Sequence, residues 1–362
     1  MTTHRIFNFS AGPAVLPEVV LDAVQRDLMA LPGVGMSALE ISHRSSNFDA
    51  ILENAERELR ELAGVPADYR VLFLQGGASL QFAMVPMNLL PSGGVADYLV
   101  TGAWSKKAVK EAEKIGQVHV AASTEPTAFA RLPLSDEVEL SPGAAYVHMT
   151  SNNTIYGTQW THLPETGPVP LVSDMSSDIV SRPISVDRFG IIYAGAQKNL
   201  GPAGVTLVII REDLLAQSPA ALPSMLSYRV LADGGSRYNT PPVFGIYILR
   251  LVLGWLGRQG GLAVMAARND RKAAILYEEL ARSEFYRGVA DATSRSRMNV
   301  TFRLPSRDLD VRFVQGATAA GLDGLEGHRM VGGLRASIYN AMPEAGVTAL
   351  REFMREFERT HG

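Results

Sequence analysis

A lysine and an aspartate, 24 positions apart, are the residues of this 362-residue chain best placed for covalent chemistry. Lys198 lies in a Gly- and Pro-rich stretch, residues 195–204, between two apolar runs. Small neighbours let a flat molecule approach the backbone, and a partly desolvated lysine amine has a lowered pKa that favours a Schiff base with a carbonyl. Asp174 ends the apolar run 169–173. Taken alone, Lys198 could equally be an ordinary exposed loop lysine.

The position of Asp174 argues against the interpretation of Lys198 as an ordinary exposed loop lysine. An acid at the carboxyl end of a strand points into the usual ligand crevice of an open α/β sheet. A lysine that forms a Schiff base and a buried acid that faces a pyridinium nitrogen are the two protein groups that pyridoxal 5′-phosphate (PLP) requires. The pair therefore predicts a PLP site.

Composition limits the other classes of function. A net charge of −3 gives no sign of nucleic acid or an anionic membrane as the main partner. The absence of cysteine excludes disulfides, thiolate metal sites and cysteine nucleophiles, and we expect no metal. The first five residues have no apolar signal core, and no charge-free apolar run reaches about 18 residues, so we expect a cytoplasmic protein without a transmembrane helix.

The elements that must position Lys198 and Asp174 alternate between strand and helix. Helices are expected from Pro17, from Asn47 to Leu62, from Leu80 to Leu90 and from the cap residue Ser105 through Lys114. Strands are expected at 70–74, 95–100, 118–121, 146–150, 169–174, 191–195 and 205–210. Candidate site residues recur just after strand ends, at positions 79, 104, 154, 174 and 198. This repetition indicates a mostly parallel, doubly wound sheet whose carboxyl edge carries the site.

Three of those strand ends carry residues suited to the parts of PLP. The turn Gln75-Gly76-Gly77-Ala78-Ser79 before a helix is typical of a phosphate site, because free N–H groups and the positive helix end face the ligand. Trp104 offers a flat face for an aromatic ring, although a tryptophan is more often part of the core. The polar residues 151–154 can hydrogen-bond a phenolic oxygen.

The second part of the chain predicts a smaller α+β domain. Gly260-Gly261 marks the expected boundary, so that residues 16–259 form the large domain, and residues 260–362 with the N-terminal arm 1–15 form the small one. The helix 243–257 is apolar on nearly all sides, as in a deeply buried helix or one at a subunit interface. Beyond it we expect helices at 262–282, 308–320 and 344–359 and strands at 298–304 and 334–338.

Two His-Arg pairs and a further arginine suggest an anionic substrate. They lie in polar or glycine-rich stretches, namely His43-Arg44, His328-Arg329 and Arg335. Arginine in tight backbone is a good fork for carboxylate or phosphate. Each arginine alone could be a solvated surface residue, but together they favour a substrate with several negative charges.

These motifs resemble the phosphoserine aminotransferase family, class V members of the fold-type-I PLP enzymes. The resemblance covers almost the whole chain in family order. It is most specific in Gln197-Lys198-Asn199-Leu200-Gly201-Pro202-Ala203-Gly204 and in His328-Arg329 through Gly333-Leu334-Arg335-Ala336-Ser337-Ile338-Tyr339-Asn340. Further matching segments are residues 8–13, 40–44, 76–82, 173–177, 238–242 and 297–300. It implies a large domain with a seven-stranded, mostly parallel sheet and a smaller α+β domain.

The resemblance also implies a role for each site residue. Lys198 would bind PLP covalently and shuttle the substrate Cα proton, Asp174 would keep the ring nitrogen protonated, Trp104 would stack on the ring and Thr154 would bind its phenolic oxygen. The cofactor phosphate would be held by Ala78, Ser79 and Gln197, and by Asn239 and Thr240 of the neighbouring subunit of a homodimer. Arg335 would bind the substrate α-carboxylate; His43, Arg44, His328 and Arg329 would bind its phosphate or the distal carboxylate of glutamate. Some family members have arginine at the position of Ser79, so the phosphate cup here is expected to be less cationic.

The implied reaction interconverts O-phospho-L-serine plus 2-oxoglutarate and 3-phosphooxypyruvate plus L-glutamate, a step of serine biosynthesis. Family members also aminate 4-phosphohydroxy-L-threonine on the route to PLP, so that compound is a further candidate substrate.

The nearest alternative function is that of another class V enzyme, of the serine or alanine–glyoxylate type, which needs no phosphate pocket. A cysteine desulfurase is excluded by the lack of cysteine. A PLP-binding regulator would need a DNA-binding element that the sequence does not show, and a cofactor-free lysine aldolase would leave Asp174 without a purpose.

Overall fold

The computed structural model describes residues 5–362, and residues 1–4 of the predicted N-terminal arm lie outside the described residues. Its helices are α1 (Glu18–Asp27), α2 (Ser46–Ala63), α3 (Gly77–Leu89), α4 (Ala103–Ala112), α5 (Glu212–Leu215), α6 (Tyr228–Asp233), α7 (Val243–Arg258), α8 (Gly261–Arg282), α9 (Arg307–Ala319) and α10 (Glu344–His361). Short 3-10 turns occupy Glu125–Thr127, Ser135–Glu137, Val186–Arg188, Ser224–Leu226 and Ala292–Ser294.

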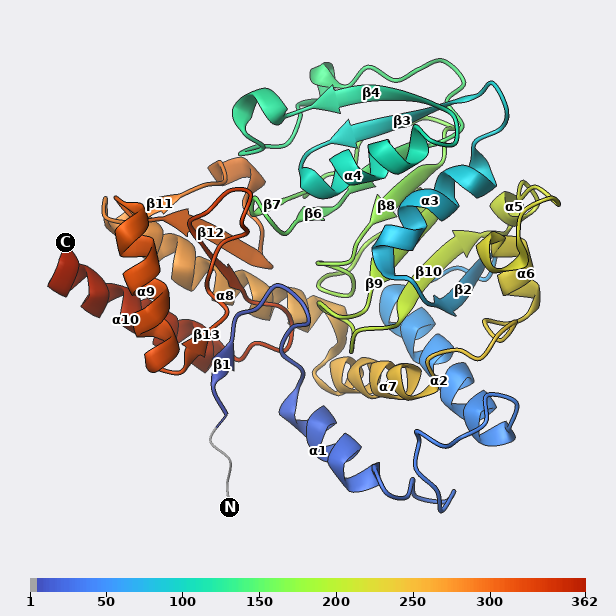
Figure 1. Cartoon of the computed structure of the whole chain (residues 1–362), viewed down its shortest axis with the longest axis horizontal. Coiled ribbons are helices and arrows are strands. Elements are labelled where there is room, and N and C mark those ends of the chain that lie inside the picture. Colours follow the sequence, from blue (N-terminus) through green and yellow to red (C-terminus); the bar gives the residue numbers. More distant parts are fainter. Residues whose placement is uncertain (1–4) are drawn as a thin grey trace.

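A seven-stranded sheet forms the centre of the larger part of the molecule (Figure 1). Its strands, in spatial order, are β2 (Tyr69–Leu74), β10 (Thr206–Arg211), β9 (Ile191–Gly195), β8 (Leu171–Asp174), β5 (Val147–Thr150), β3 (Val95–Val100) and β4 (Gln117–Ser123). β10 runs antiparallel to both of its neighbours, and the pairs from β9 to β4 are parallel. The predicted mostly parallel sheet is confirmed.

Both faces of this sheet are covered, as expected for strands that read as nearly continuous apolar runs. One face packs beneath α2 and α7, and Phe73, Leu171 and Ile192 belong to that core. The other face packs beneath α3 and α4, with Leu72, Val172 and Tyr193 in its core. Neighbouring residues of one strand thus alternate between two hydrophobic cores, which is the doubly wound arrangement.

A smaller part carries α8, α9 and α10 against the three-stranded antiparallel sheet β11 (Arg287–Gly288), β12 (Asn299–Arg303) and β14 (Leu334–Ser337) (Figure 1). The N-terminal arm joins it, because β1 (Phe7–Asn8) pairs in parallel with β13 (Leu322–Asp323). A further short pair is β6 (Asn152–Asn153) with β7 (Thr158–Gln159). Within residues 5–362, no helix has both the length and the apolar character needed to cross a membrane.

Local sequence signals account for most element ends, and two expected helix starts were wrong. α3 begins at Gly77 rather than Leu80, since Gly76 and Gly77 take the positive φ angles of 87° and 64° that turn the strand directly into the helix. α4 begins at Ala103 rather than after Ser105, whose hydroxyl accepts from the Gly102 N–H at 3.1 Å. Phe7 and Asn8 of the arm form β1, whose partner β13 lies more than 300 residues away in the sequence.

Candidate active site

Lys198 and Asp174 meet in one cavity at the carboxyl edge of the large sheet. The cavity has a volume of about 290 Å³. Its walls come from both parts of the molecule and from the arm, and they contain Ala11, Gly12, Gly77, Ala78, Ser79, Phe82, Trp104, Thr154, Ile155, Asp174, Ser176, Gln197, Lys198, His328 and Arg335. Residues that follow β2, β3, β6, β8 and β9 therefore converge as the strand-end pattern predicted.

Asp174 is fixed through one oxygen and leaves the other available. It ends β8 and is 5% exposed. Its Oδ1 accepts from the Ser176 hydroxyl at 2.6 Å and from the Ser176 N–H at 3.0 Å, and in the described residues no hydrogen bond reaches Oδ2. The Ser176 hydroxyl in turn accepts from the Gly195 N–H at 3.0 Å, which ties the ends of β8 and β9 together. Ser176 was missed by the sequence reasoning, although a serine two residues after an aspartate is a familiar signal for such a turn.

Lys198 lies in the turn after β9 and points back into the cavity. Its Nζ donates to the Thr154 hydroxyl at 3.0 Å and lies 5.5 Å from the centre of the Trp104 ring. Burial lowers the pKa of Lys198, Asp174 opposes that shift, and Arg335 adds to it. Burial likewise raises the pKa of Asp174, and Lys198 and the Ser176 hydrogen bonds oppose the increase. Burial therefore shifts the pKa of both groups, and shifted pKa values are common among catalytic residues.

The N-terminal turn of α3 faces the same cavity and is suited to an anion. The N-cap residue is Gly76, and no side chain caps the first N–H groups of the helix there. Ala78 and Ser79 lie in this first turn and line the cavity. Helix N-termini of this kind bind phosphate through N–H groups and the helix dipole. A Cβ at Gly76 would lie 2.5 Å from the Leu80 side chain, so glycine is required there.

Trp104 and the N-terminal arm form further walls. Trp104 lies in the first turn of α4, and its Nε1 is buried without a hydrogen-bond partner in residues 5–362. Gly12 lies against Lys198, since a Cβ at Gly12 would be 3.1 Å from the Lys198 Cγ. The arm is held there by the Ala14 N–H, which donates to the Gln197 carbonyl at 2.9 Å. The structure thus places the arm beside Lys198.

Arg335 and His328 bring positive charge from the smaller part. Arg335 lies on β14 opposite Thr301, and its Nε is buried without a partner in the described part of the chain. Burial lowers the pKa of Arg335, and burial followed by Arg335 and Arg329 lowers the pKa of His328. A negatively charged ligand beside these two side chains would raise both pKa values again. Arg335 and His328 therefore suit an anion bound between the larger and the smaller part of the molecule.

Five of the predicted site residues do not line this cavity within one protomer, namely His43, Arg44, Asn239, Thr240 and Arg329. Arg44 is exposed in the segment that precedes α2. Asn239 donates to the Gln75 side chain at 3.1 Å, and the Gln75 side chain donates to the Thr240 carbonyl at 3.3 Å, just before the Gly76-Gly77 turn. Arg329 lies on an adjacent groove with Arg303 and Arg307. These five roles stay predictions.

Comparisons with known proteins agree with this geometry. The model of the aminotransferase class V family matches residues 6–350. The chain belongs to the class V aminotransferases. A phosphoserine aminotransferase from Desulfosudis oleivorans is 58% identical over 99% of this chain and 100% of its own length. The class V relatives also include solved structures of phosphoserine aminotransferases. One from Bacillus circulans subsp. alkalophilus is 51% identical with a TM-score of 0.97, over 99% of each chain. A PLP-bound one from Trichomonas vaginalis is 38% identical with a TM-score of 0.94, over 97% of this chain and 100% of its own.

Proposed function

We propose that this class V aminotransferase uses PLP to interconvert O-phospho-L-serine plus 2-oxoglutarate and 3-phosphooxypyruvate plus L-glutamate, in serine biosynthesis. The observation that carries the proposal is a single cavity lined by Lys198, by Asp174 and by the N-terminal turn of α3. Within residues 5–362, Asp174 Oδ2 accepts no hydrogen bond. The full-length similarity to phosphoserine aminotransferases supports the same reaction. A cytoplasmic location stays a prediction.

The residues present fit PLP. Asp174 Oδ2 is free to accept a hydrogen bond from a ring nitrogen, and a positive charge there would offset the burial that now raises the pKa of Asp174. Trp104 would flank the ring, Thr154 would bind its phenolic oxygen, and Ala78, Ser79 and Gln197 would hold its phosphate. When bound, PLP supplies an electron sink for the bonds at the substrate Cα.

Lys198 would hold and move the proton in this reaction. Its lowered pKa increases the fraction of neutral amine, and a neutral amine is both a nucleophile toward PLP and a general base toward the substrate Cα proton. The hydrogen bond to Thr154 fixes the direction of Nζ within the cavity. The same Nζ then returns the proton, so one group performs both transfers.

Arg335 would orient the substrate. Its guanidinium comes from β14 in the smaller part of the molecule, lines the same cavity as Lys198, and would form a paired contact with the α-carboxylate. This contact fixes which bond at Cα faces the base. His328 lines the same wall and would bind the substrate phosphate, or the distal carboxylate of glutamate, together with Arg329, His43 and Arg44.

A homodimer with shared active sites would complete the cavity. Asn239 and Thr240 are proposed to reach the cofactor phosphate of the neighbouring subunit. The segment between α1 and α2 supports an interface, because Met29 is 84% exposed and Leu39 is 61% exposed shortly before His43. A second subunit seated on this segment would cover both side chains.

Initial rates with matched donors test the substrate. We expect kcat/KM for O-phospho-L-serine, with 2-oxoglutarate as acceptor, to exceed that for L-serine or L-alanine by at least about 100-fold, since each charged contact to the phosphate contributes about 1.5–3 kcal/mol. Equal rates for the three donors would favour the serine or alanine–glyoxylate alternative. 4-Phosphohydroxy-L-threonine, assayed beside them, tests the second candidate substrate.

A further inference from the structure

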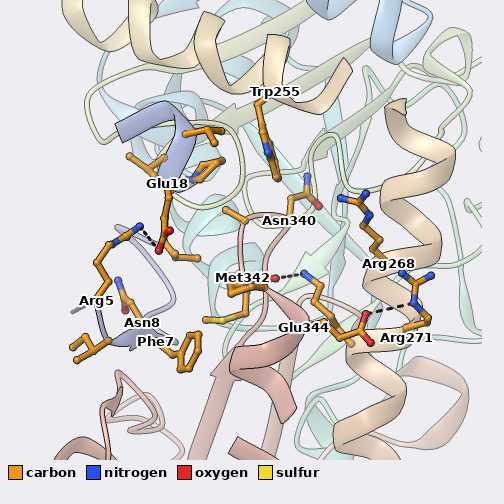
Figure 2. Close-up of a pocket in the computed structure, with 18 residues that line it drawn as sticks. Arg5, Phe7, Asn8, Glu18, Trp255, Arg268, Arg271, Asn340, Met342 and Glu344 are labelled. Carbon is orange, nitrogen blue, oxygen red and sulfur yellow. Dashed lines mark hydrogen bonds and ion pairs between the residues drawn. The ribbon is translucent and has the colours of Figure 1, made fainter. Parts of the chain in front are cut away.

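A second cavity, of about 480 Å³, lies on another side of the junction between the two parts of the molecule (Figure 2). Its walls are the arm around β1, the start of α1, the end of α7, one face of α8 and the loop before α10. It shares no lining residue with the candidate active site. Its volume falls in the range of small-molecule sites, which is about 300–1,000 Å³.

Ion pairs neutralise most charges in this cavity, but Arg268 has no acidic partner among the described residues. Arg5 pairs with Glu18 at 3.2 Å, and Arg271 pairs with Glu344 at 3.5 Å. Figure 2 shows these two pairs, with Arg268 free of dashed lines to the residues drawn. In residues 5–362 the only hydrogen bond of the Arg268 side chain goes to the Gln259 side chain outside the cavity wall. Most of its N–H donors are therefore available.

Lys272 adds positive charge without adding free donors. It is 2% exposed, and its Nζ donates to the carbonyls of Tyr339 at 2.7 Å, Ile338 at 2.9 Å and Met342 at 3.1 Å. An ammonium group has three N–H donors, so all are used. Burial lowers the pKa of Lys272 to about 7, and Glu344 opposes that shift while Arg268 adds to it. Lys272 can thus carry a positive charge near neutral pH but has no donor left for a ligand, and in the part of the chain that the structure describes Arg268 is the cation of this cavity that has available donors and no acidic partner.

Much of the remaining wall is apolar, although Asn8 and Asn340 also line it. Phe7, Leu16, Val19, Trp255 and Met342 line it. Trp255 is partly buried and stands over the cavity in Figure 2, on the same side as Asn340. An aromatic face beside a guanidinium fork suits a ligand with one charged end and one apolar end.

We propose that this cavity binds a small organic carboxylate, with the carboxylate on Arg268 and its apolar body against Trp255. A single free guanidinium matches the two oxygens of one carboxylate, whereas a phosphate monoester, with up to two negative charges, would call for a second cation with free donors. Lys272 supports the anion through its charge but cannot reach it, because its donors are already used.

Calorimetric titration of the PLP-loaded enzyme with 3-phenylpropionate tests the proposal. The same titrations are repeated on Arg335→Met, so that any binding through Arg335 in the active site is recognised by its loss. The neutral amide, 3-phenylpropionamide, is the matched ligand. Arg268→Met removes the fork and keeps an apolar stem, while Arg271→Met removes a guanidinium that already has a carboxylate partner and serves as the matched variant.

We expect 3-phenylpropionate to bind with a Kd of about 0.1–3 mM, the range of a ligand with one charged contact and a modest apolar area. The amide and the Arg268→Met variant should each bind about 10-fold more weakly, and Arg271→Met should stay within about 3-fold of the unmodified enzyme. Lack of binding up to about 20 mM, equal affinity for acid and amide, or an unchanged Kd in a folded Arg268→Met variant would overturn the proposal. Tighter binding of phenyl phosphate than of the carboxylate would overturn the ligand class. The acid–amide comparison on the unmodified enzyme and on Arg335→Met does not depend on the Arg268→Met variant, so it tests the proposal even where that variant fails to fold.

Discussion

Replacement of Asp174 by asparagine separates the charge of this residue from its geometry. Oδ1 of Asp174 accepts two hydrogen bonds from Ser176, and an asparagine oxygen can accept both. The asparagine amide would then take the place of Oδ2 and could still hydrogen-bond an uncharged ring nitrogen. Asp174→Asn therefore keeps the packing of a residue that is 5% exposed and removes only the negative charge.

The loss of that charge should strongly lower kcat. Two opposite charges about 3–4 Å apart attract by about 4–5 kcal/mol at an effective dielectric constant of about 20, and a neutral hydrogen bond returns about 1 kcal/mol of this. A net loss of about 3–4 kcal/mol corresponds to a decrease in kcat of about 10²–10³-fold. KM for the substrate should change much less, because Arg335 and His328 are untouched.

The same change should not weaken the apoenzyme. Burial raises the pKa of Asp174 above its ordinary value, so the folded state binds a proton more readily than the unfolded state. Between the two pKa values, stability then falls as pH rises, and above both values the full penalty of an ionised buried acid is present. An asparagine side chain cannot ionise, so Asp174→Asn should gain stability relative to the unmodified apoenzyme as pH rises from about 4 to about 7.

Two assays check these expectations on the same preparations. Steady-state kinetics with O-phospho-L-serine gives kcat and KM, and urea unfolding of the apoenzyme at pH 4.5 and 7.5 gives the free energies of unfolding. A kcat within about 10-fold of the unmodified enzyme would refute the role of the Asp174 charge. A large loss of stability at pH 7.5 would show instead that Asp174 is a structural residue.

Three further predictions concern other parts of the account. Lys198→Ala should abolish turnover and the covalent attachment of PLP while circular dichroism stays unchanged; transamination at a near-normal rate would contradict the assignment. Arg329→Leu should lower kcat/KM for O-phospho-L-serine by at least about 10-fold more than for L-alanine, since a charged hydrogen bond contributes about 1.5–3 kcal/mol; an equal loss for both donors would mean that the phosphate is bound elsewhere. Asn340→Ala leaves the Val180 carbonyl and the Asn269 side-chain amide without their hydrogen bonds of 2.9 and 2.8 Å, so urea unfolding should show a loss of about 2–4 kcal/mol, and a change below about 0.5 kcal/mol would show that these bonds contribute little.

The sequence contained enough information to predict the sheet edge of the site. Asp174 and Lys198 follow apolar runs of strand length, and parallel strands bring their carboxyl ends to one edge, so local pattern alone placed them together. The same argument placed Ser79, Trp104 and Thr154, all of which line the cavity. The predicted starts of α3 and α4 were wrong by two or three residues, because glycine turns shortened the connections.

Contacts between distant segments could not be predicted in this way. The pairing of β1 with β13 and the hydrogen bond of 2.9 Å from the Asn340 N–H to the Asn199 side chain join residues more than 100 positions apart. In both cases, the local sequence pattern of a segment does not indicate which distant segment it contacts. The second cavity was missed for the same reason, since Arg268 and Trp255 lie on helices that read as ordinary amphipathic or buried helices.

An absorbance spectrum of the purified protein, before and after addition of O-phospho-L-serine, tests the central claim most directly. Lys198 beside Asp174 predicts a visible band from covalently bound PLP, and O-phospho-L-serine should convert it to a near-ultraviolet band of the aminated cofactor. A band that responds to L-alanine or L-serine but not to O-phospho-L-serine would contradict the proposed substrate. No visible band after incubation with PLP would contradict the role of Lys198 and with it the proposed function.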